Sequence, residues 1–304
     1  MIAMNTFSAL FFIATSLIFY PLVFAQQVGS GSSNLPVQLD ELTAPGFVEA
    51  VKKSDATCII PLGIMEKHGP HLPLGTDLFD VREIALRAAK KEYCIVFPPF
   101  YFGQIFEAKH QPGTIAYSPR LVWDVLQGTC DELARNGIKK IILVNGHGGN
   151  NNFLPYFCQA QLEKKREYAV ILFRPASDPE VEKKVKQLSK TDFDSHAGET
   201  ETSMMLSHRP DLVDVEKGKD QSGSDLNRLP HISNAYVGIW WYAKFPNHYA
   251  GDGSYANVEI GELLINSEAE QLAELIRVIK EDQDILRLQQ RFYLESENPL
   301  NTKQ

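Results

Sequence analysis

Short apolar runs alternate with amphipathic stretches along most of this chain of 304 residues. Four runs are apolar at nearly every position and are expected to be strands: residues 58–62, 94–97, 141–144 and 170–173. Three stretches between them carry apolar residues at helical spacing: residues 78–91, 118–136 and 151–166. Strands that are apolar on both faces are typical of parallel sheets covered by helices. The alternation therefore predicts an α/β fold, a three-layer α/β/α domain with a mostly parallel sheet.

Composition and charge narrow the classes of function. Hydrophobic residues make up 44% of the chain and charged residues 22%, so it can bury a full core. The formal net charge of -8 argues against a nucleic-acid partner, because phosphate binding needs a basic surface. We expect a small-molecule substrate, and one further long helix over residues 259–291.

The first 25 residues differ in composition from the rest. Residues 9–25 are almost uninterruptedly apolar, and Ala25 before Gln26 fits a small-residue cleavage site, which predicts a signal peptide over residues 1–25. The alternative is an uncleaved anchor, since the run approaches the roughly 20 residues that span a bilayer. Both interpretations place the folded part outside the cytoplasm, secreted or periplasmic, and cleavage would leave no stable membrane insertion.

The remaining chain is interpreted as one domain. Residues 26–36 are rich in Gln, Gly and Ser and predict a flexible leader, residues 37–295 form the domain, and residues 296–304 are a tail. Four cysteines lie in apolar or helical contexts without a C-x-x-C pair: Cys58, Cys94, Cys130 and Cys158. They are expected to be buried thiols, with one disulfide as the alternative.

Residues 60–77 concentrate metal-ligating side chains among glycines and prolines. Glu66, His68, His71 and Asp77 lie here, and carboxylates and imidazoles are the ligands of catalytic zinc, manganese and iron. Asp77 could instead cap the helix that follows, and His71 fits a hydrogen-bonded structural role as well as ligation. We interpret Glu66, His68 and Asp77 as ligands.

Two further polar clusters follow along the chain. His147 lies within residues 145–150, directly after an expected strand, where ligand sites of open α/β sheets occur. Residues 194–202 contain His196, Glu199 and Glu201. At helical spacing the two glutamates cannot both face one site, so one of them is structural.

These motifs resemble the creatininase (creatinine amidohydrolase) family. The resemblance is carried by residues 61–77, 145–150 and 196–203, and it extends over about residues 37–270. It implies a three-layer α/β fold, homo-oligomers that are often hexamers, and two divalent metal ions per subunit, Zn, Mn or Fe. By this resemblance Glu66 and His147 bind one metal, His68 binds the other, and Asp77 bridges them.

The chain departs from creatininase at two neighbouring positions. Gly149 stands where creatininase has a further glutamate ligand, and Gly148 replaces a tyrosine that touches creatinine. We expect Glu199 to supply the missing ligand, or else to share proton transfer with His196. The departure predicts a substrate other than creatinine.

The resemblance implies a binuclear-metal-dependent amidohydrolase that cleaves the C–N bond of a non-peptide or small peptide amide through a metal-bridging hydroxide. His196 is the predicted catalytic residue that protonates the leaving nitrogen, because imidazole titrates near neutral pH. Two alternatives stay open: a metal-dependent hydrolase of an ester or lactone, and a non-catalytic member that only binds a ligand.

Overall fold

The computed structural model describes Met1 and residues 35–302, so all but the first residue of the predicted signal peptide (residues 1–25) and most of the leader lie outside the described residues. One sheet contains four strands, β1 (Thr57–Leu62), β2 (Ile95–Val96), β3 (Lys140–Asn145) and β4 (Ala169–Leu172). Their order is β2-β1-β3-β4, and every neighbouring pair is parallel. The predicted parallel sheet is confirmed, with strand bounds within one or two residues of those expected.

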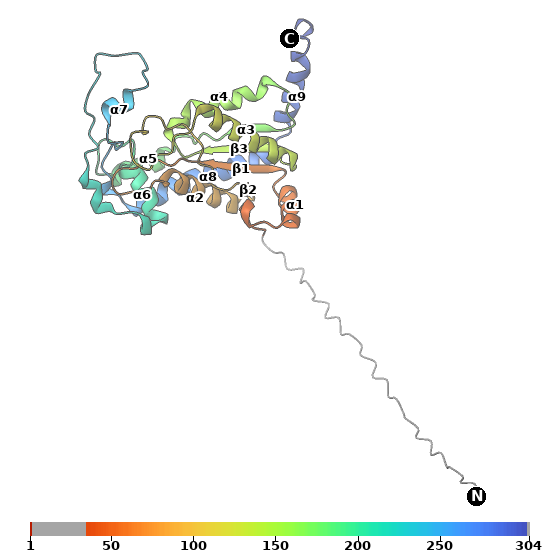
Figure 1. Ribbon diagram of the computed structural model, residues 1–304, viewed down its shortest axis with the longest axis horizontal. Coiled ribbons are helices and arrows are strands. Elements are labelled where there is room, and N and C mark those ends of the chain that lie inside the picture. Colours follow the sequence, from red (N-terminus) through yellow and green to blue (C-terminus); the bar gives the residue numbers. More distant parts are fainter. Residues whose placement is uncertain (2–34, 303–304) are drawn as a thin grey trace. The chain divides into compact units, whose positions relative to one another are not determined.

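Helices cover both faces of this sheet (Figure 1). One face packs against α2 (Thr76–Lys91) and α8 (Val258–Glu281), and the other against α1 (Ala44–Lys53), α3 (Pro119–Arg135) and α4 (Phe153–Ala160). Along β1, Ile59 belongs to the first core, whereas Ile60 belongs to the second. Successive strand residues point to opposite faces, so a strand that is apolar at every position supplies both cores. The predicted three-layer α/β/α fold is confirmed.

The remaining helices surround this sandwich. They are α5 (Pro179–Leu188), α6 (Glu199–His208), α7 (Trp240–Lys244) and α9 (Asp284–Ser296), with short 3-10 helices at Leu39–Glu41, Gly148–Asn151, Gln161–Glu163, Pro210–Leu212, Val215–Asp220, Gly253–Tyr255 and Pro299–Asn301. Among them, α6 matters most for the site, because it packs against both α2 and α8.

Two predicted helices differ from those observed. The expected helix over residues 259–291 is wrong as a single helix: α8 ends at Glu281 and α9 begins at Asp284. Asp282, the C-cap of α8, has extended backbone dihedrals, so the helix ends there. Its Oδ2 accepts from the Ile285 amide in the first turn of α9 at 2.9 Å, which satisfies one amide at the start of the second helix. The helix expected over residues 151–166 shortens to α4, because the residues on either side of it form 3-10 turns.

All four cysteines lie in the described part of the chain and are free thiols, three of them buried and Cys158 partly exposed. The expected buried thiols are thus found at Cys58, Cys94 and Cys130, and the alternative of a disulfide is not. Among the described residues, no helix combines the length and hydropathy that crossing a bilayer requires.

Candidate metal centre

The carboxyl ends of β1 and β3 bring the first two polar clusters together. Leu62 and Asn145, the last residues of these strands, are paired across the sheet. The residues that follow them are glycines, and both lie against the first turn of α2. A Cβ on Gly63 would lie 2.6 Å from the backbone nitrogen of Leu78, and one on Gly146 would lie 2.8 Å from the backbone oxygen of Asp77. Because neither glycine has a side chain, α2 can begin between the two strand ends and deliver Asp77 there.

Asp77 lies between the two clusters and presents one oxygen to each. Its Oδ1 is 2.9 Å from Nε2 of His68, and its Oδ2 is 3.1 Å from Nδ1 of His147. Nδ1 of His147 is also 2.9 Å from Oε1 of Glu66. Asp77 is in the first turn of α2 rather than at its N-cap, which is Gly75, so it does not act as a helix cap. The structure therefore brings Glu66, His68, Asp77 and His147 together.

In His68 and His147, one ring nitrogen faces a carboxylate of the cluster and the other, here called the outer nitrogen, faces a backbone carbonyl. The hydrogen bond of the outer nitrogen decides which nitrogen carries the ring proton. Nδ1 of His68 is 3.3 Å from the backbone oxygen of Glu66, and Nε2 of His147 is 2.8 Å from that of Gln104. A carbonyl only accepts, so these outer nitrogens carry the protons. In the neutral rings, bare lone pairs then face carboxylate oxygens. This arrangement, with the second nitrogen donating to a backbone carbonyl, is typical of metal-ligating histidines.

Two carboxylate oxygens reinforce this interpretation. Oε1 of Glu66 and Oδ2 of Asp77 are buried and accept no hydrogen bond from a described residue. A buried acceptor without a hydrogen-bond partner costs folding free energy, and the cost is larger when the acceptor is an anionic carboxylate. A divalent cation would satisfy these oxygens and the imidazole lone pairs at once, so the residues present fit a metal.

The third cluster reaches the site through the loop before α6 and its first turn. His196 is buried, and its Nε2 donates to the backbone oxygen of Lys67 at 3.0 Å. Oε2 of Glu201 lies 3.7 Å from Nδ1 of His196 and 4.0 Å from Nε2 of His68. Within the described part of the chain, three sets of possible ligands have atoms within 4.8 Å of one another: Glu66-Asp77-His147, His68-His196-Glu201 and Glu66-His196-His248.

Glu199 does not join these groups, which corrects its expected place in the site. Its carboxylate is buried and accepts from the Lys190 amide at 2.9 Å and from the amide and hydroxyl of Thr191 at 3.0 and 2.7 Å. These bonds hold the segment that follows α5. Glu201, two residues further along the helix, faces the cavity instead. The expectation that only one of the two glutamates faces the site agrees with this arrangement.

His71 has the structural role that the sequence left open. Its Nε2 lies 2.8 Å from the Thr202 hydroxyl, and its ring packs against Tyr249 with centroids 5.5 Å apart. His71 is in none of the groups that could hold a metal among the described residues.

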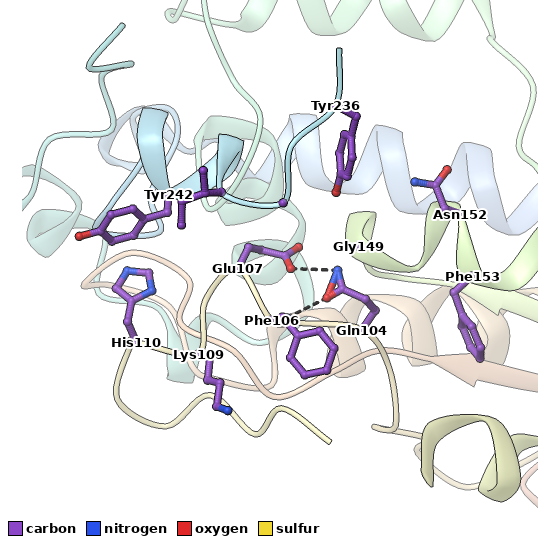
Figure 2. A pocket seen from close by; sticks show the side chains of 12 residues that line it. Gln104, Phe106, Glu107, Lys109, His110, Gly149, Asn152, Phe153, Tyr236 and Tyr242 are labelled. Atoms are coloured by element: carbon purple, nitrogen blue, oxygen red, sulfur yellow. Dashed lines mark hydrogen bonds between the residues drawn. The ribbon is translucent and has the colours of Figure 1, made fainter. Parts of the chain in front are cut away.

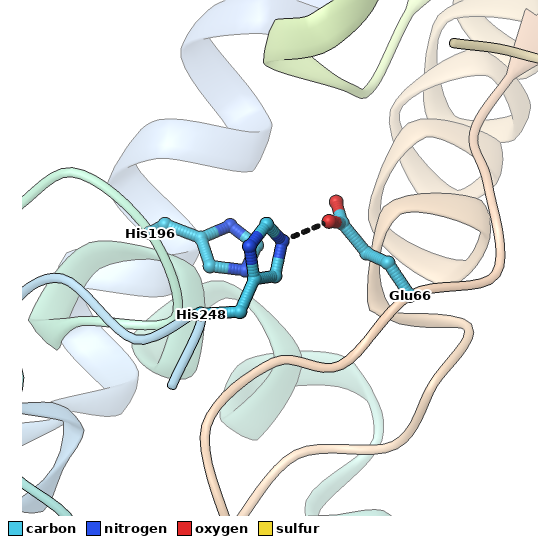
Figure 3. Close-up of side chains that lie close together, drawn as sticks. All are labelled: Glu66, His196 and His248. Carbon is cyan, nitrogen blue, oxygen red and sulfur yellow. Dashed lines mark hydrogen bonds and ion pairs between the residues drawn. The ribbon is translucent and has the colours of Figure 1, made fainter. Parts of the chain in front are cut away.

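His248 is a site residue that the sequence analysis missed. It lies in a turn-rich segment without a recognisable motif, yet its Nε2 contacts Oε2 of Glu66 (Figure 3). Its ring lies beside that of His196, with centroids 4.4 Å apart. No local pattern signals this contact, because 182 positions separate His248 from Glu66.

Burial and mutual charge shift the titration of this cluster. Burial disfavours the charged form of His68, but the neighbouring carboxylate of Asp77 outweighs burial and raises the pKa of His68 to about 10. Burial alone would also raise the pKa of Glu66, but His147 and His196 outweigh it and hold this pKa well below its usual range. For His248 burial dominates and lowers the pKa to about 4, so its ring is neutral at neutral pH. Positive charge is thus favoured at His68, where a cation would replace the proton.

Two adjoining cavities give access to the cluster. The inner one, of about 360 Å³, is lined by Glu66, Asp77, His147, His196 and Glu201 among others. The outer one, of about 800 Å³, is lined largely by aromatic and polar side chains, including Phe106, Phe153, Tyr236 and Tyr242 (Figure 2). Gln104 and Glu107 line both cavities, and they are hydrogen bonded to each other at 2.9 Å. A substrate in the inner cavity can therefore extend into the outer one.

Gly149 has no room for a side chain of any kind. A Cβ there would lie 2.4 Å from Nε2 of His147 and 2.7 Å from the backbone oxygen of Gln104, in the path of the hydrogen bond between them. In this chain the hydrogen bond that orients His147 thus excludes a glutamate at position 149.

The fold and this cluster define a class of protein: three-layer α/β proteins with carboxylates and histidines gathered at the carboxyl edge of a parallel sheet. A sequence model of the creatininase family, described as creatinine amidohydrolase, matches residues 40–276. The chain therefore belongs to the creatininase family of amidohydrolases.

Individual relatives differ in the reactions for which they are named. The creatinine amidohydrolase of Pseudomonas putida is 28% identical over 201 residues, which are 60% of this chain and 76% of the relative. The 3-dehydro-scyllo-inosose hydrolase of Thermotoga maritima is 27% identical over 81% of this chain and 84% of the relative. The mycofactocin precursor peptide peptidase of Mycolicibacterium smegmatis is 31% identical over 51% and 59%, respectively.

Solved structures show the same fold. A crystal structure of creatinine amidohydrolase superposes with a TM-score of 0.70 at 23% identity and covers 81% of this chain and 99% of that one. A mutant creatininase of the Zn-Zn type has a TM-score of 0.69 with the same identity and coverage.

Proposed function

We propose that this protein is a metal-dependent amidohydrolase with two divalent cations that cleaves a C–N amide bond. The observation that carries the proposal is the placement of Asp77, whose two oxygens face different histidine nitrogens at 2.9 and 3.1 Å. Glu66, Asp77 and His147 would hold one cation, and His68, Asp77 and Glu201 the other. A creatininase structure of the Zn-Zn type and another with manganese support zinc or manganese as the two cations.

The chain's own residues would then perform the reaction. Two bound cations would supply activation of a water molecule and polarisation of the amide carbonyl. Asp77 holds the two ligand sets together, and the backbone carbonyls of Gln104 and Glu66 keep the lone pairs of His147 and His68 turned inward. His196 lines the inner cavity, and we assign to it the delivery of a proton to the leaving nitrogen.

The cavities support a substrate longer than creatinine. Gly148 and Gly149 place no side chain beside His147, and the inner cavity opens into an outer one of about 800 Å³. Aromatic walls suit an amide that carries an apolar or cyclic group. The related peptide peptidase supports a short peptide as one candidate of this kind.

The first test is metal analysis by mass spectrometry after equilibration with Zn, Mn or Fe. We expect about two equivalents per chain in the wild type and a sharp fall in Asp77→Ala, because this residue belongs to both ligand sets. Asp124→Ala is the matched control, since Asp124 is a largely exposed carboxylate on α3. No more than trace metal in the wild type would refute the binuclear proposal and favour a ligand-binding member of the family.

The second test is a substrate panel with the metal-loaded protein. Creatinine, formamides, short peptides, a lactone, an ester and a cyclic inosose would be compared. Turnover of an amide that disappears in His196→Gln without loss of bound metal supports the mechanism. Turnover of only the lactone, ester or inosose would leave the metal centre in place and refute C–N cleavage.

A further inference from the structure

His248 has the opposite proton arrangement to the other histidines of the centre. Its Nδ1 accepts a hydrogen bond from the indole Nε1 of Trp241 at 2.8 Å. An indole N–H can only donate, so Nδ1 is bare and the ring proton lies on Nε2. That nitrogen faces Oε2 of Glu66, to which it therefore donates (Figure 3).

A nitrogen that binds a metal needs a free lone pair directed at the ion. His68, His147 and His196 meet this requirement, since each directs its second nitrogen at a backbone carbonyl. With Trp241 in place, His248 does not.

We propose that His248 is a positioning residue that directs Glu66 toward the metal and is not itself a ligand. Its Nε2–H occupies Oε2 of Glu66, which leaves Oε1 free to face Nδ1 of His147 at 2.9 Å. Trp241 acts through His248, because its N–H selects the tautomer of the His248 ring that can donate to Glu66. The inference rests on the proposed metal centre and adds two residues that orient one of its ligands.

The backbone around His248 also supports a role in the site. His248 has a φ of +52°, a left-handed conformation that is uncommon for residues other than glycine and recurs at functional sites. Its side chain is 3% exposed. The preceding residue, Asn247, accepts at its backbone oxygen from Nζ of Lys67 at 2.6 Å, which ties this segment to the loop between Glu66 and His68.

Three substitutions test the proposal through zinc affinity, measured by chelator competition. In His248→Asn the side chain tolerates the left-handed backbone but is too short to reach Glu66, so affinity at one site should fall about 10- to 100-fold while stoichiometry stays at two. His248→Gln keeps an amide N–H near the position of Nε2 and should recover most of the loss. Trp241→Phe should lower the affinity in the same direction, because the ring is then free to adopt either tautomer.

Matched controls and a second readout separate this role from a structural one. His231→Gln changes an exposed histidine, and Trp123→Phe changes an indole on α3 that packs against Phe157; neither should alter zinc affinity. The absorption spectrum of the Co²⁺-loaded protein should keep its shape in His248→Asn, because the ligand set is unchanged. A changed Co²⁺ spectrum, or the loss of one bound metal, would show that His248 is itself a ligand. Unchanged zinc affinity in His248→Asn would show that His248 does not position Glu66. Either result overturns the inference. Failure of the wild type to bind metal would instead refute the proposed function.

Discussion

Glu199 and Glu201 show how a change of two residues along a helix separates a structural role from a site role. Two positions along an α-helix correspond to a rotation of about 200°, so the two side chains leave α6 on nearly opposite sides. Glu199 accepts hydrogen bonds from Lys190 and Thr191, whereas Glu201 faces His68 and His196. The sequence indicated that the two must differ, but the expectation that Glu199 is the one in the site was wrong.

Substituting each glutamate by glutamine should separate the two roles. Glu201→Gln should lower the bound metal from about two equivalents to about one, because an amide is a poorer ligand than a carboxylate. Glu199→Gln should keep both metals and lower the free energy of unfolding by about 1–3 kcal/mol, because the amide turns a donor toward other donors. Metal analysis and chemical denaturation measure the two effects. Loss of metal in Glu199→Gln with none in Glu201→Gln would reverse this assignment.

Metal affinity should rise with pH below the pKa of His68, where the metal-free ring still carries the proton that a metal must displace. The carboxylate of Asp77 overcomes burial and raises the pKa of His68 to about 10, so near neutral pH a cation must displace a proton. Zinc affinity should increase up to about tenfold per pH unit for each proton released, measured by chelator competition from about pH 6 to 8. A pH-independent affinity would show that the metal-free ring is already neutral.

The same shift predicts the opposite trend for the metal-free protein. Because the pKa of folded His68 lies above its unfolded value, near 6.5, the folded state binds more protons between about pH 6.5 and 10. The stabilisation that comes from protonated His68 is complete below this pH window and is lost as the pH rises through it. Thermal denaturation of the metal-free protein should therefore show a melting temperature that falls over this range, with a smaller change when metal is bound.

The position of α6 depends on a close crossing with α8. A Cβ on Gly261 of α8 would lie 2.0 Å from the backbone oxygen of Ser203 on α6. At the same crossing, the Ser203 hydroxyl accepts from the Asn257 amide at 2.8 Å. Since Glu201 lies two residues before Ser203, this crossing also determines where Glu201 points.

Gly261→Ala should therefore destabilise the protein and weaken the metal centre together. The added methyl group would push α6 away from α8, at a cost of about 1–3 kcal/mol in the free energy of unfolding and with lower metal affinity. Gly128→Ala on α3 is the matched control: its Cβ meets nothing within 4 Å, so it should add about 0.5–1 kcal/mol of stability. Denaturation and metal titration of both variants measure this. Equal stabilisation by both would show that the crossing is looser than described.

At the scale of whole elements, local pattern located most strands and helices but not every boundary. The apolar periodicity of residues 259–291 continues through a break at residues 282–283, because the apolar positions of α8 and α9 happen to keep the same spacing. At the break, the side chain of Asp282 accepts a hydrogen bond from the Ile285 amide in the first turn of α9. A single capping hydrogen bond leaves only a faint trace in hydrophobic periodicity.

For the molecule as a whole, the predicted cleavage after Ala25 is open to direct measurement. Expressed with its full N-terminal segment in a host with a secretory pathway, the chain should be exported and should begin at Gln26. Intact-mass measurement and N-terminal sequencing of the exported protein check this. A membrane-associated chain that keeps residues 1–25 would support the alternative, an uncleaved anchor.

The assembly that the family resemblance implies also remains a prediction. We expect a homo-oligomer, with a hexamer as the form that members often adopt. Light scattering of the purified protein would measure its mass. A monomer at every concentration tested would contradict the expectation.

Much of the fold and part of the site could be inferred along the chain, because both depend on short-range order. Apolar runs determine which segments become buried parallel strands, and the polar residues that follow two of them, Glu66, His68 and His147, must then emerge at one edge of the sheet. Two features of the site could not be inferred in this way: that Glu201 rather than Glu199 faces the cavity, and that His248 contacts Glu66. The first depends on the rotation of α6 against α8, and the second joins residues 182 positions apart. Contacts of this kind arise from packing between distant segments, which no local spacing encodes.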